Sequence, residues 1–494
     1  MTDTLIVGGG TAGCVLAARL SENPDHTVRL LEAGRLWRAP DGFPAELLDA
    51  TSLPVGADAP WLWRYPVTLS DAGVAGNIVR GKVIGGSGAV NGSYFVRATA
   101  ADFEAWSREL DSSKTWSFDS VLPAYCRSER DVDFGDHPWH GRSGPIPVRR
   151  SANPAPLSEQ FATACAAVGF PAIPDLNANA DAHGVGAVPC NIEDGRRVST
   201  ASGYLLPALS RPNLTVQEAT TVVRIRFRGM RAIGVDVMHD DRTETIWADH
   251  IVLSAGAIES AALLLRSGVG DAEHLRALDI PVVHPAPVGA WFTDHPEIGL
   301  EYRLDAPEQA TVPLEYVLEL DDIEIRPYTV AFTPGVQRLG IALMRPQSAG
   351  VLRLRSADPA IPPAIEHRYL SAEHDRTRLR DAVATAAQVL HRMSAQSRTD
   401  PMPRPSKTAD AWLHANLATS QHLSGTCRMG GADDDRAVVD ELCRVHGLTG
   451  LSVIDLSVVP VPLSRGPQAT TVMIAENMAD HRSRDGGGRT SPRL

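Results

Sequence analysis

A glycine-rich turn close to the start of the chain constrains its fold more than any other feature. Gly8, Gly10 and Gly13 stand in G-x-G-x-x-G spacing between a short apolar run at 5–7 and a helix-period stretch at 14–20. In such a turn the first glycine permits the tight bend, the second lets the backbone approach a pyrophosphate, and the third lets helix and strand pack closely. The order predicts the first β-α-β unit of a dinucleotide-binding fold.

A second apolar run, at 28–31, completes this unit and ends on Glu32. Glu32 follows Gly13 by 19 residues, a position from which a carboxylate can accept hydrogen bonds from ribose hydroxyls. The first turn of the helix contains Thr11 and Ala12, and its free N–H groups and positive dipole end suit phosphates. The motif by itself fits NAD and FAD equally.

A second glycine-rich loop follows at 80–91, where Gly81, Gly85, Gly86 and Gly88 fall within eight residues. A backbone so rich in glycine passes close to a ligand or to another segment, or it adopts positive φ angles. It lies too far along the chain to belong to the first turn, which favours a larger cofactor with two contact regions, such as FAD. Taken alone, the stretch fits an ordinary loop equally well.

The rest of the chain alternates between two patterns. Residues 213–225 predict a pair of strands, and 248–270 repeat the strand-turn-helix order of the opening. Residues 296–415 differ: alternating strands at 300–304, 314–320, 323–328, 340–344 and 351–354 precede one long amphipathic helix at about 375–393. We expect there an antiparallel sheet with a helix on it. Residues 451–480 return to an apolar strand, a loop and a helix.

Composition narrows the class of protein. A chain of 494 residues with a net charge of −12 predicts two domains and argues against nucleic acid as the main partner. No signal peptide and no apolar run of membrane-spanning length are expected. Six scattered cysteines without a C-x-x-C pair predict reduced thiols of a cytoplasmic protein and no metal site. The tail from residue 482 is polar and Gly-rich, which predicts disorder.

Several blocks, in order along nearly the whole chain, resemble the glucose–methanol–choline (GMC) flavoprotein oxidoreductases. Together they are far more specific than one glycine motif. The blocks are GGGTAGCVLAARLSE (8–22), RGKVIGGSGAVNGSYFVR (80–97), NLTVQEATTVVRI (213–225), IVLSAGAIESAALLLRSGVG (251–270), DH (294–295), HLSGTCRM (422–429), VIDLSVVP (453–460) and IAENMAD (474–480).

The resemblance implies bound FAD and an α/β fold, with a discontinuous FAD-binding Rossmann-like β-α-β domain and an α+β substrate domain built on an antiparallel sheet. The implied division is 1–295 for the N-terminal FAD-binding part, with cap segments at about 37–76 and 130–190; 296–415 for the substrate domain; 416–481 for the part completing the FAD domain and active site; and 482–494 for the disordered tail.

The resemblance also implies cofactor-binding residues at matching positions. The first β-α-β unit is expected to bind the adenosine diphosphate half through Gly8, Gly10, Thr11, Ala12, Gly13 and Glu32. The second loop is expected to contact the flavin through Arg80, Gly85, Gly86 and Asn91. The backbone of Val222 is expected to contact adenine, and Asp455 and Gln468 are expected near the ribityl chain and the ring.

His422 matches the family's active-site histidine. Alcohol oxidation removes a hydroxyl proton and a carbon-bound hydride, and an imidazole beside the flavin can accept the proton while the hydride goes to N5. Without the surrounding block, a structural role is the better interpretation of a single histidine. With the block, the resemblance implies catalysis.

The chain departs from the family pattern at two positions. Some members link FAD covalently through a histidine just before the loop asparagine; here that residue is Val90, so we expect non-covalent FAD. The family usually places a second His or Asn where this chain has Gly466. We therefore expect Arg465 or Gln468 to take over part of that role, or the substrate to supply the group. A cationic Arg465 favours anionic flavin or an acidic, enol-like substrate.

Three sequence segments most resemble the mycofactocin-associated GMC dehydrogenases. They are HGRSGPIPVRR (140–150), IEIRPYT (323–329) and SRGPQAT (464–470). This branch implies reoxidation of reduced mycofactocin, with electrons passing to a quinone or the respiratory chain from a protein at or near the inner face of the plasma membrane. His140 and Arg326 are candidate substrate-side residues, with structural roles at least as well supported.

Two other functions stay open. The first is oxidation of a free small alcohol, choline-like or aliphatic. The second is a non-redox FAD lyase of the hydroxynitrile type, which the same fold hosts.

Overall fold

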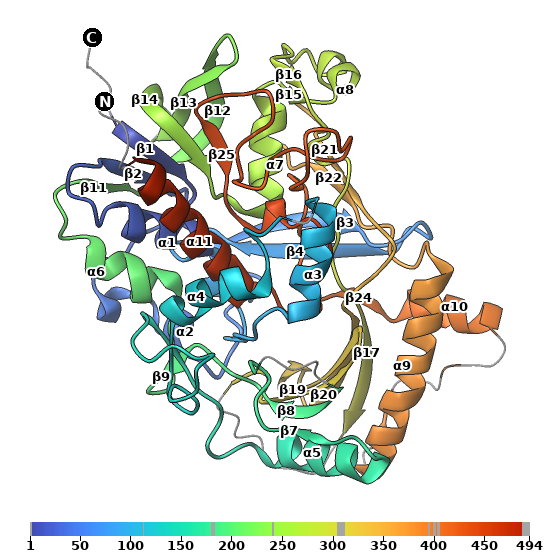
Figure 1. The fold of residues 1–494 in the computed structure, drawn as a ribbon. Helices are drawn as coiled ribbons and strands as arrows, with labels where there is room; N and C mark the ends of the chain where they lie inside the picture. The colour runs from blue at the N-terminus through green and yellow to red at the C-terminus, as the bar shows by residue number, and fades with distance from the viewer. Residues whose placement is uncertain are drawn as a thin grey trace.

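The computed structural model describes residues 2–111, 113–178, 183–239, 242–303, 312–393, 396–398, 402 and 406–486. Two large sheets organise them, one mostly parallel and one antiparallel. Figure 1 shows the parallel sheet in the upper part of the molecule and the antiparallel sheet in the lower part. The mixed α/β class predicted from the sequence is confirmed.

The predicted first β-α-β unit is present as β1 (Thr2–Val7), α1 (Thr11–Leu20) and β2 (Val28–Leu31). β1 lies between β2 and β14 (Arg242–Leu253), and all three are parallel. β11 (Leu214–Gln217) and β25 (Leu451–Val453) extend the parallel sheet on its two sides. Helices cover the sheet, which explains the continuous apolar runs in its strands. Strands from three distant parts of the chain therefore build this sheet.

β14 is twelve residues long and pairs with strands on both of its halves. Its first half pairs antiparallel with β13 (Arg231–His239), which pairs with β12 (Thr221–Arg228). Its second half enters the parallel sheet and leads into α7 (Gly256–Arg266), as the sequence predicts.

α11 (Gln468–Gly486) packs alongside α1 (Figure 1). The sequence predicts a disordered tail from residue 482; within it, residues 482–486 continue the helix. Arg482 donates a hydrogen bond to Ser452 Oγ and Arg484 pairs with Asp480, so both side chains support the last turn. Residues 487–494 lie outside the described part.

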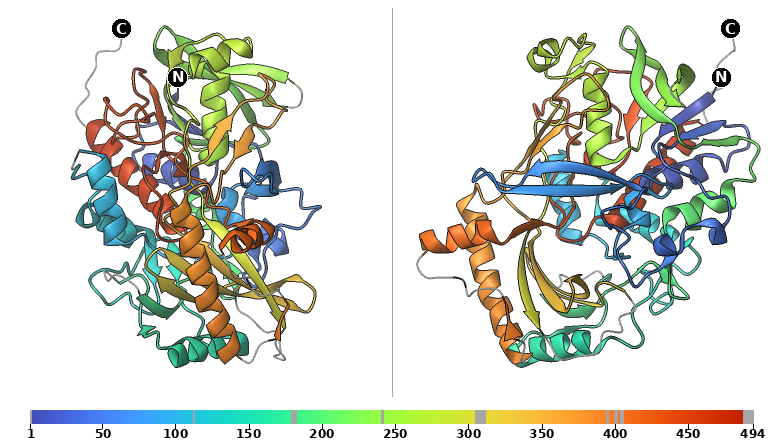
Figure 2. Two further views of the ribbon diagram at one scale, coloured as in Figure 1. Left: turned by 90° about the vertical axis from the view of Figure 1, so that its right-hand side faces the viewer. Right: turned by 180° about the vertical axis from the view of Figure 1, so that it is seen from behind.

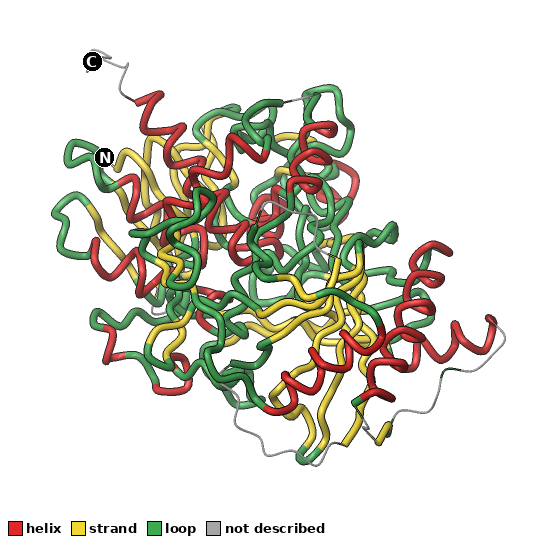
Figure 3. The backbone as a smooth tube through the Cα atoms, turned by 60° about the horizontal axis from the view of Figure 1, so that its bottom comes forward, coloured by secondary structure: helices red, strands yellow, loops and turns green. Residues whose placement is uncertain are grey.

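The antiparallel sheet has the order β23-β17-β20-β19-β18-β8-β7, with β24 beside β17. Its strands are β17 (Pro296–Arg303), β18 (Tyr316–Leu320), β19 (Ile323–Thr333), β20 (Val336–Leu343), β7 (Ala172–Ile173), β8 (His183–Ala187), β23 (Gln396–Ser397) and β24 (Leu417–Thr419). The predicted long helix is α9 (Glu373–Arg392), and with α5 (Pro156–Val168) it packs on this sheet (Figures 1 and 3). The sheet therefore receives β7, β8 and β24 from outside the expected segment 296–415.

A third, four-stranded sheet lies between these two parts. It contains β21 (Val351–Arg353), β22 (Ala364–Glu366), β3 (Leu62–Thr68) and β4 (Ala75–Gly81). The sequence pattern places 351–354 with the antiparallel sheet, but β21 pairs with β22 instead. The β3–β4 hairpin crosses the middle of the molecule in the right view of Figure 2, and β4 leads directly into the second glycine loop.

The remaining elements are short. They are η1 (Pro40–Gly42), α2 (Ala45–Leu48), η2 (Gly86–Ala89), α3 (Ala100–Glu109), α4 (Phe118–Ser128), β5 (Glu129–Asp131), β6 (Ile146–Val148), β9 (Ile192–Glu193), β10 (Arg196–Arg197), η3 (Ala201–Leu205), α6 (Leu206–Ala208), β15 (Val269–Gly270), α8 (Ala272–Ala277), β16 (His284–Pro285), α10 (Ser406–Ala415) and η4 (Leu456–Val458). Within the described part of the chain, no helix combines the length and the apolarity needed to cross a bilayer.

Candidate active site and cofactor-binding site

The two glycine-rich segments meet at the start of α1. Gly85 N–H donates to the carbonyl of Gly9 at 2.7 Å. Gly86 has φ +56°, and a Cβ there would lie 2.6 Å from Cα of Gly10. Gly10 begins α1 without a capping side chain, and the first turn holds no acidic residue. The free N–H groups of this turn therefore suit an anionic ligand.

A second helix begins at the same place. Gln468 is the first residue of α11, and Thr11 Oγ1 donates to its side-chain oxygen at 3.3 Å. A Cβ on Gly88 would lie 2.7 Å from both Thr11 Oγ1 and Gln468 Nε2. Two helix N-termini, α1 and α11, thus converge on the loop around 85–88. Each favours negative charge, as needed beside a pyrophosphate or an electron-rich ring.

Glu32 is tied to the glycine turn. Gly9 N–H donates to Oε2 and Gly34 N–H donates to Oε1, each at 2.7 Å. Burial raises the pKa of Glu32 to about 7 despite these two bonds. Thr220 N–H donates a hydrogen bond to the carbonyl oxygen of Glu32 at 2.8 Å. This bond brings the start of β12, which contains Val222, close to the carboxyl end of β2. Contacts of Glu32 with ribose and of Val222 with adenine stay predictions.

Asp455 lies at the end of β25 and is almost fully buried. Its Oδ2 accepts hydrogen bonds from Gly256 N–H at 2.8 Å and Ser260 Oγ at 2.6 Å, and Oδ1 accepts from Ser457 N–H. The carboxylate therefore caps the start of α7 and joins two segments 200 residues apart. Its predicted place beside the ribityl chain stays a prediction.

Asn91 and Arg80 are the other two predicted cofactor-binding residues of the second glycine loop. Asn91 Oδ1 accepts a hydrogen bond from Ser93 N–H at 3.0 Å. Arg80, in β4, reaches the side chain of Gln421, whose Oε1 also accepts from Val79 N–H at 3.0 Å. This contact connects the second glycine loop to the residue just before His422.

His422 is hydrogen-bonded to a second histidine, which the sequence analysis does not assign to the site. The Nδ1 atoms of His295 and His422 are 2.8 Å apart, and the rings are nearly perpendicular at 84°. The available signal was the DH pair at 294–295, which stands among the blocks without a role. His295 lies in the loop before β17, so the topology, not sequence spacing, brings it to His422.

Hydrogen bonding determines the protonation of this pair. The backbone carbonyl of Leu463 accepts a hydrogen bond from the His295 ring, and because Nδ1 faces His422, the proton falls to Nε2. The neutral His295 ring then has a lone pair on Nδ1, which accepts from His422 Nδ1–H. His422 Nε2 is left without a proton and can act as a base.

Burial keeps both histidines neutral. Burial lowers the pKa of His295 to about 4, and Asp294 opposes this shift. Burial, with His295 and the positive charge of Arg326, lowers the pKa of His422 well below its usual value. At neutral pH His422 is therefore in the form that accepts a proton.

Asp294 fixes the backbone of both histidines. Its Oδ1 accepts from the N–H groups of His295 and His422, each at 2.7 Å. Its Oδ2 accepts from Thr419 Oγ1 at 3.0 Å and contacts His367 Nε2 at 3.2 Å. Interaction with the neighbouring histidines holds the pKa of this buried carboxyl below its usual range although burial alone raises it. A permanent negative charge thus stands behind the pair and stabilises a proton taken up by His422.

The antiparallel sheet presents a buried ion cluster near this pair. Arg326 donates to Glu324 Oε2 at 2.8 Å through Nε and to Glu297 Oε2 at 3.0 Å through Nη1. Ser420 and Tyr328 hydroxyls also donate to Glu297. The structural alternative for Arg326 is thereby supported, since its donors are engaged by protein groups.

Arg465 is buried, and its guanidinium is engaged by protein groups. It pairs with Glu319 Oε2 at 2.7 Å and donates to the carbonyls of Arg97 and Leu176. Burial raises the pKa of Glu319 to about 7 although Arg465 opposes the shift. Each carboxylate of the sheet cluster thus has an arginine partner. A direct role of Arg465 or Gln468 in the reaction stays a prediction.

His140 lies in a separate buried cluster. Its Nδ1 is 2.9 Å from Glu129 Oε1 and 3.2 Å from Asp131 Oδ2, and its Nε2 is 2.9 Å from Asp175 Oδ2. These carboxylates raise the pKa of His140 to about 10 against the effect of burial. Among the described residues, this is the one group with metal-ligand geometry. Arg97 and Arg150 pair with the same carboxylates, so the imidazolium already balances the charge.

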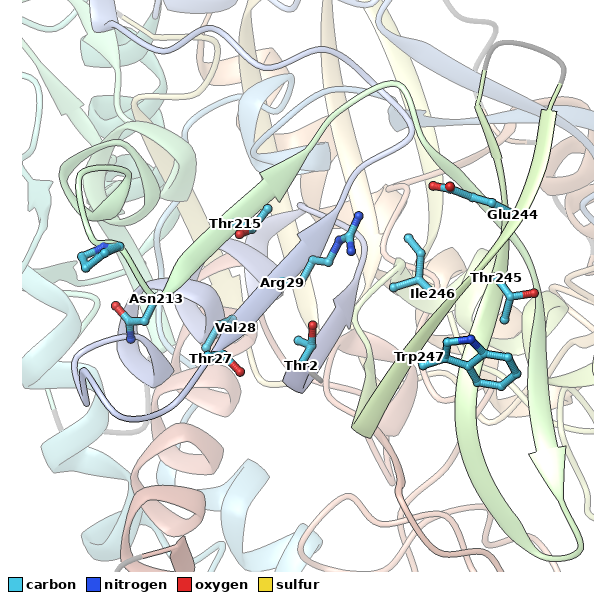
Figure 4. Close-up of a pocket in the computed structure, with 11 residues that line it drawn as sticks. Thr2, Thr27, Val28, Arg29, Asn213, Thr215, Glu244, Thr245, Ile246 and Trp247 are labelled. Carbon is cyan, nitrogen blue, oxygen red and sulfur yellow. The ribbon is translucent and has the colours of Figure 1, made fainter. Parts of the chain in front are cut away.

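A surface pocket of about 550 Å³ lies elsewhere (Figure 4). It is lined by the starts of the parallel strands, including Thr2, Val28 and Asn213, and by Trp247. Ligands of such sheets bind at the opposite, carboxyl ends of the strands, where α1 and α7 begin. The pocket is therefore not part of the site described above.

Comparison with known proteins identifies the family of this chain. Models of the N-terminal and C-terminal parts of GMC oxidoreductases match residues 2–297 and 346–475. The chain belongs to the GMC oxidoreductase family. A GMC-type oxidoreductase of Rhodococcus erythropolis, named "Uncharacterized GMC-type oxidoreductase in thcA 5'region", is 46% identical over 488 residues, which cover 96% of this chain and 97% of the relative.

Further GMC relatives carry names that state an activity. Oxygen-dependent choline dehydrogenase 1 of Chromohalobacter salexigens is 34% identical over 98% of this chain and 95% of its own. The crystal structure of pyridoxine 4-oxidase from Mesorbium loti superposes with a TM-score of 0.92 at 29% identity, covering 98% of this chain and 99% of that one. Together they confirm an FAD-dependent oxidoreductase acting on CH–OH donors. None of these relatives is named as a lyase, and the lyase alternative is not supported.

The residues of this GMC protein fit FAD. The uncapped start of α1, the close contact of Gly86 with Gly10, and the converging start of α11 form a cradle in which side chains are excluded and N–H groups are free. Gly8, Gly10, Thr11, Ala12, Gly13, Gly85 and Gly86 are brought together there. The contact of Arg80 with Gln421 connects the second glycine loop to the segment that carries His422, and Gly466, two residues before α11, lies next to the His422 ring.

Proposed function

We propose that His422 is the general base of this oxidoreductase and that the donor is reduced mycofactocin, whose electrons pass on to the respiratory chain. Bound FAD supplies the hydride acceptor. The observation that carries the proposal is the hydrogen-bonded chain from Leu463 through His295 to His422, which leaves Nε2 of His422 free to take the donor's hydroxyl proton.

The reaction then balances simply. The donor loses a proton from its hydroxyl to His422 Nε2 and a hydride from its carbon, and becomes a carbonyl compound. His422 stays hydrogen-bonded to His295 through Nδ1–H in both protonation states. Asp294 stabilises the imidazolium formed during the step, because its carboxylate is buried and accepts hydrogen bonds from the backbone N–H groups of both histidines.

Several features support the finer assignments. The sequence segments at 140–150, 323–329 and 464–470 support assignment to the mycofactocin-associated branch of the family. Val90 is buried and has no nucleophilic atom, which supports non-covalent FAD. For the electron acceptor we propose a quinone of the respiratory chain, reached by a cytoplasmic protein at the inner face of the membrane.

We assign Arg465 an anchoring role within this mechanism. Its ion pair with Glu319 and its bonds to two carbonyls hold the 464–468 loop against the antiparallel sheet. Ser464 strengthens the same anchor, since its N–H and hydroxyl both donate to Asp102. Leu463, whose carbonyl orients His295, directly precedes this loop.

The second candidate is a dehydrogenase of a free small alcohol, favoured by relatives named choline dehydrogenase and pyridoxine 4-oxidase. A quaternary ammonium donor such as choline can be bound by a carboxylate without a cationic partner or by aromatic ring faces. Glu297 and Glu324 are paired with Arg326, and Glu319 with Arg465. The pairing of these three carboxylates therefore leaves only the aromatic mode of binding for such a donor among these groups.

Anaerobic mixing with candidate donors separates the two functions. Reduced mycofactocin, choline and pyridoxine are each added to the FAD-loaded enzyme, and the flavin absorbance is followed. Bleaching by reduced mycofactocin, with slow or no bleaching by the free alcohols, is expected. Rapid reduction by choline or pyridoxine and none by reduced mycofactocin would contradict the proposed donor. His422→Ala is the control, and its flavin should be reduced far more slowly by any donor while FAD is retained.

A further inference from the structure

The third sheet brings a histidine to the carboxylate that fixes His295 and His422. His367 directly follows β22, and its backbone N–H donates to the carbonyl of Thr68 in β3 at 2.8 Å. Its ring is buried, and its Nε2 lies 3.2 Å from Oδ2 of Asp294. A sheet separate from the parallel and the antiparallel one thus places this ring beside Asp294.

The neighbours of the His367 ring determine which of its nitrogens donates. A carboxylate can only accept hydrogen bonds, so the nitrogen that faces Oδ2 of Asp294 carries a hydrogen. The other nitrogen, Nδ1, is buried and has no hydrogen-bond partner among the described residues. The ring packs edge-on against Phe292, with centroids 5.2 Å apart, and against Tyr369 at 4.7 Å. Within the described part of the chain, the bond from Nε2 to Asp294 is therefore the one polar contact of this side chain.

The two oxygens of Asp294 have different partners. Oδ1 accepts hydrogen bonds from the backbone N–H groups of His295 and His422. Oδ2 accepts from two side chains, those of His367 and Thr419. A buried carboxylate that loses a donor takes up a proton more easily. The donors at Oδ2 thus control whether Asp294 stays charged.

His367 is the donor that matters most for this charge. Burial raises the pKa of Asp294, and the hydrogen bond from His367, with its charge interaction, does most to lower the pKa again. The interactions of Asp294 with His422 and His295 contribute less, and both of these rings are neutral before the reaction.

The other charged or titratable groups near Asp294 and the two histidines have their own partners. They are Arg80 in β4, Tyr369 after β22, and Glu324 and Arg326 in β19. Arg80 donates to Val79 and Gln421. Tyr369, whose pKa burial raises well above its usual value, is a neutral phenol that donates to Thr419. Glu324 and Arg326 pair with each other. His367 is therefore the group among these that donates directly to the Asp294 side chain.

We propose that His367 is a positioning residue for the reaction, because its Nε2–H keeps Asp294 ionised and directed at the backbone of both histidines. This role rests on the proposed assignment of His422 as the base. A protonated Asp294 carries no charge, so the imidazolium formed on His422 would lose its buried counter-ion. Flavin reduction without the His367 donor should therefore slow most at acid pH, where the carboxyl takes up its proton.

Two substitutions separate the hydrogen bond of His367 from its packing. His367→Phe keeps a ring against Phe292 and Tyr369 and loses the donor, whereas His367→Gln loses the ring and keeps an N–H for Oδ2. Anaerobic flavin reduction by reduced mycofactocin, choline or pyridoxine is measured in the FAD-loaded enzymes from about pH 5 to about pH 8. The ratio of the rate at the upper pH to that at the lower pH should be about tenfold larger in His367→Phe than in the wild type, as expected for a lost hydrogen bond to a charged group. In His367→Gln the ratio should stay within about threefold of the wild type.

Infrared difference spectra test the charge of Asp294 without any donor. Spectra of the FAD-loaded enzyme at about pH 5 and about pH 8 are subtracted to reveal carboxyl groups that gain a proton. Glu32 and Glu319, whose pKa values burial raises to about 7, contribute to every variant alike. We expect an additional carboxyl band in His367→Phe that is absent from the wild type and His367→Gln and disappears when Asp294→Asn is combined with His367→Phe.

FAD content and thermal midpoint are measured for every variant, and His367→Leu replaces His367→Phe if the larger ring prevents FAD binding. Three outcomes would overturn the proposal: a pH profile of the Phe variant that matches the wild type, equal impairment of the Gln and Phe variants, or no additional carboxyl band. If no donor reduces the wild-type flavin while the Asp294 band appears in His367→Phe, the proposed function fails and the role of His367 in keeping Asp294 charged stands.

Discussion

Removing the acceptor nitrogen of His295 should slow flavin reduction without disturbing donor binding. His295→Phe leaves the Nδ1–H of His422 without a partner, or lets the proton move to Nε2, where the ring can no longer accept one. An unsatisfied buried donor costs about 1–3 kcal/mol. Since about 1.4 kcal/mol corresponds to a tenfold change in rate, reduction should slow roughly 5- to 150-fold. KM for the donor should change little.

The matched variant is His295→Asn, whose amide can both accept from His422 and donate to the Leu463 carbonyl. It should retain more of the rate than His295→Phe. The assay is anaerobic stopped-flow reduction of the bound flavin, with FAD content and thermal midpoint measured for each variant. The reasoning is refuted if His295→Phe reduces its flavin at the wild-type rate, or if the Asn and Phe variants, both folded and FAD-loaded, are equally slow.

Three further predictions test other parts of the account. Gly86→Ala should abolish FAD retention because its Cβ meets Gly10, whereas Gly73→Ala, at a similar positive φ of +79° with nothing within 4 Å, should retain FAD; equal FAD content in the two would contradict the cradle. The rate of flavin reduction should stay constant from about pH 6 to 9, because the lowered pKa of His422 keeps it unprotonated; an inflection near its ordinary value of about 6.5 would contradict this. His140→Gln should lower the free energy of unfolding at pH 7 by about 3–5 kcal/mol, as expected for a broken buried ion cluster. The contribution of His140 is full below its unfolded pKa of about 6.5 and is lost as the pH rises toward about 10, so equilibrium unfolding of the variant and the wild type should converge there.

Local pattern was sufficient for much of the fold. The strand at 28–31, the helix after Gly10 and the long helix near 375–393 were predicted because each carries its own hydrophobic period and boundary residues. The β3–β4 hairpin was missed since Pro66 and Gly76 interrupt its alternation. The strand at 351–354 was predicted as a strand and assigned to the wrong sheet, because periodicity does not specify the partner strand.

In the candidate site, too, some residues follow from contiguous sequence patterns and others depend on the packing of distant segments. The glycine turn and Glu32 follow from the sequence because the dinucleotide motif is contiguous. The partnership of His295 with His422 joins residues 127 positions apart and has no periodicity. The contact of His367 with Asp294 joins residues 73 positions apart. Such pairs are created by the packing of three sheets, which single-chain patterns do not encode.

The most direct test of the account is anaerobic reduction of the bound flavin by reduced mycofactocin, compared between the wild type and His422→Ala at matched FAD content. The account predicts rapid bleaching of the wild-type flavin and reduction slowed about 10²- to 10⁴-fold in the variant, the range expected for loss of a general base. Equal rates in the two proteins would contradict the assignment of His422 as the base, and an unchanged wild-type spectrum would contradict the proposed donor.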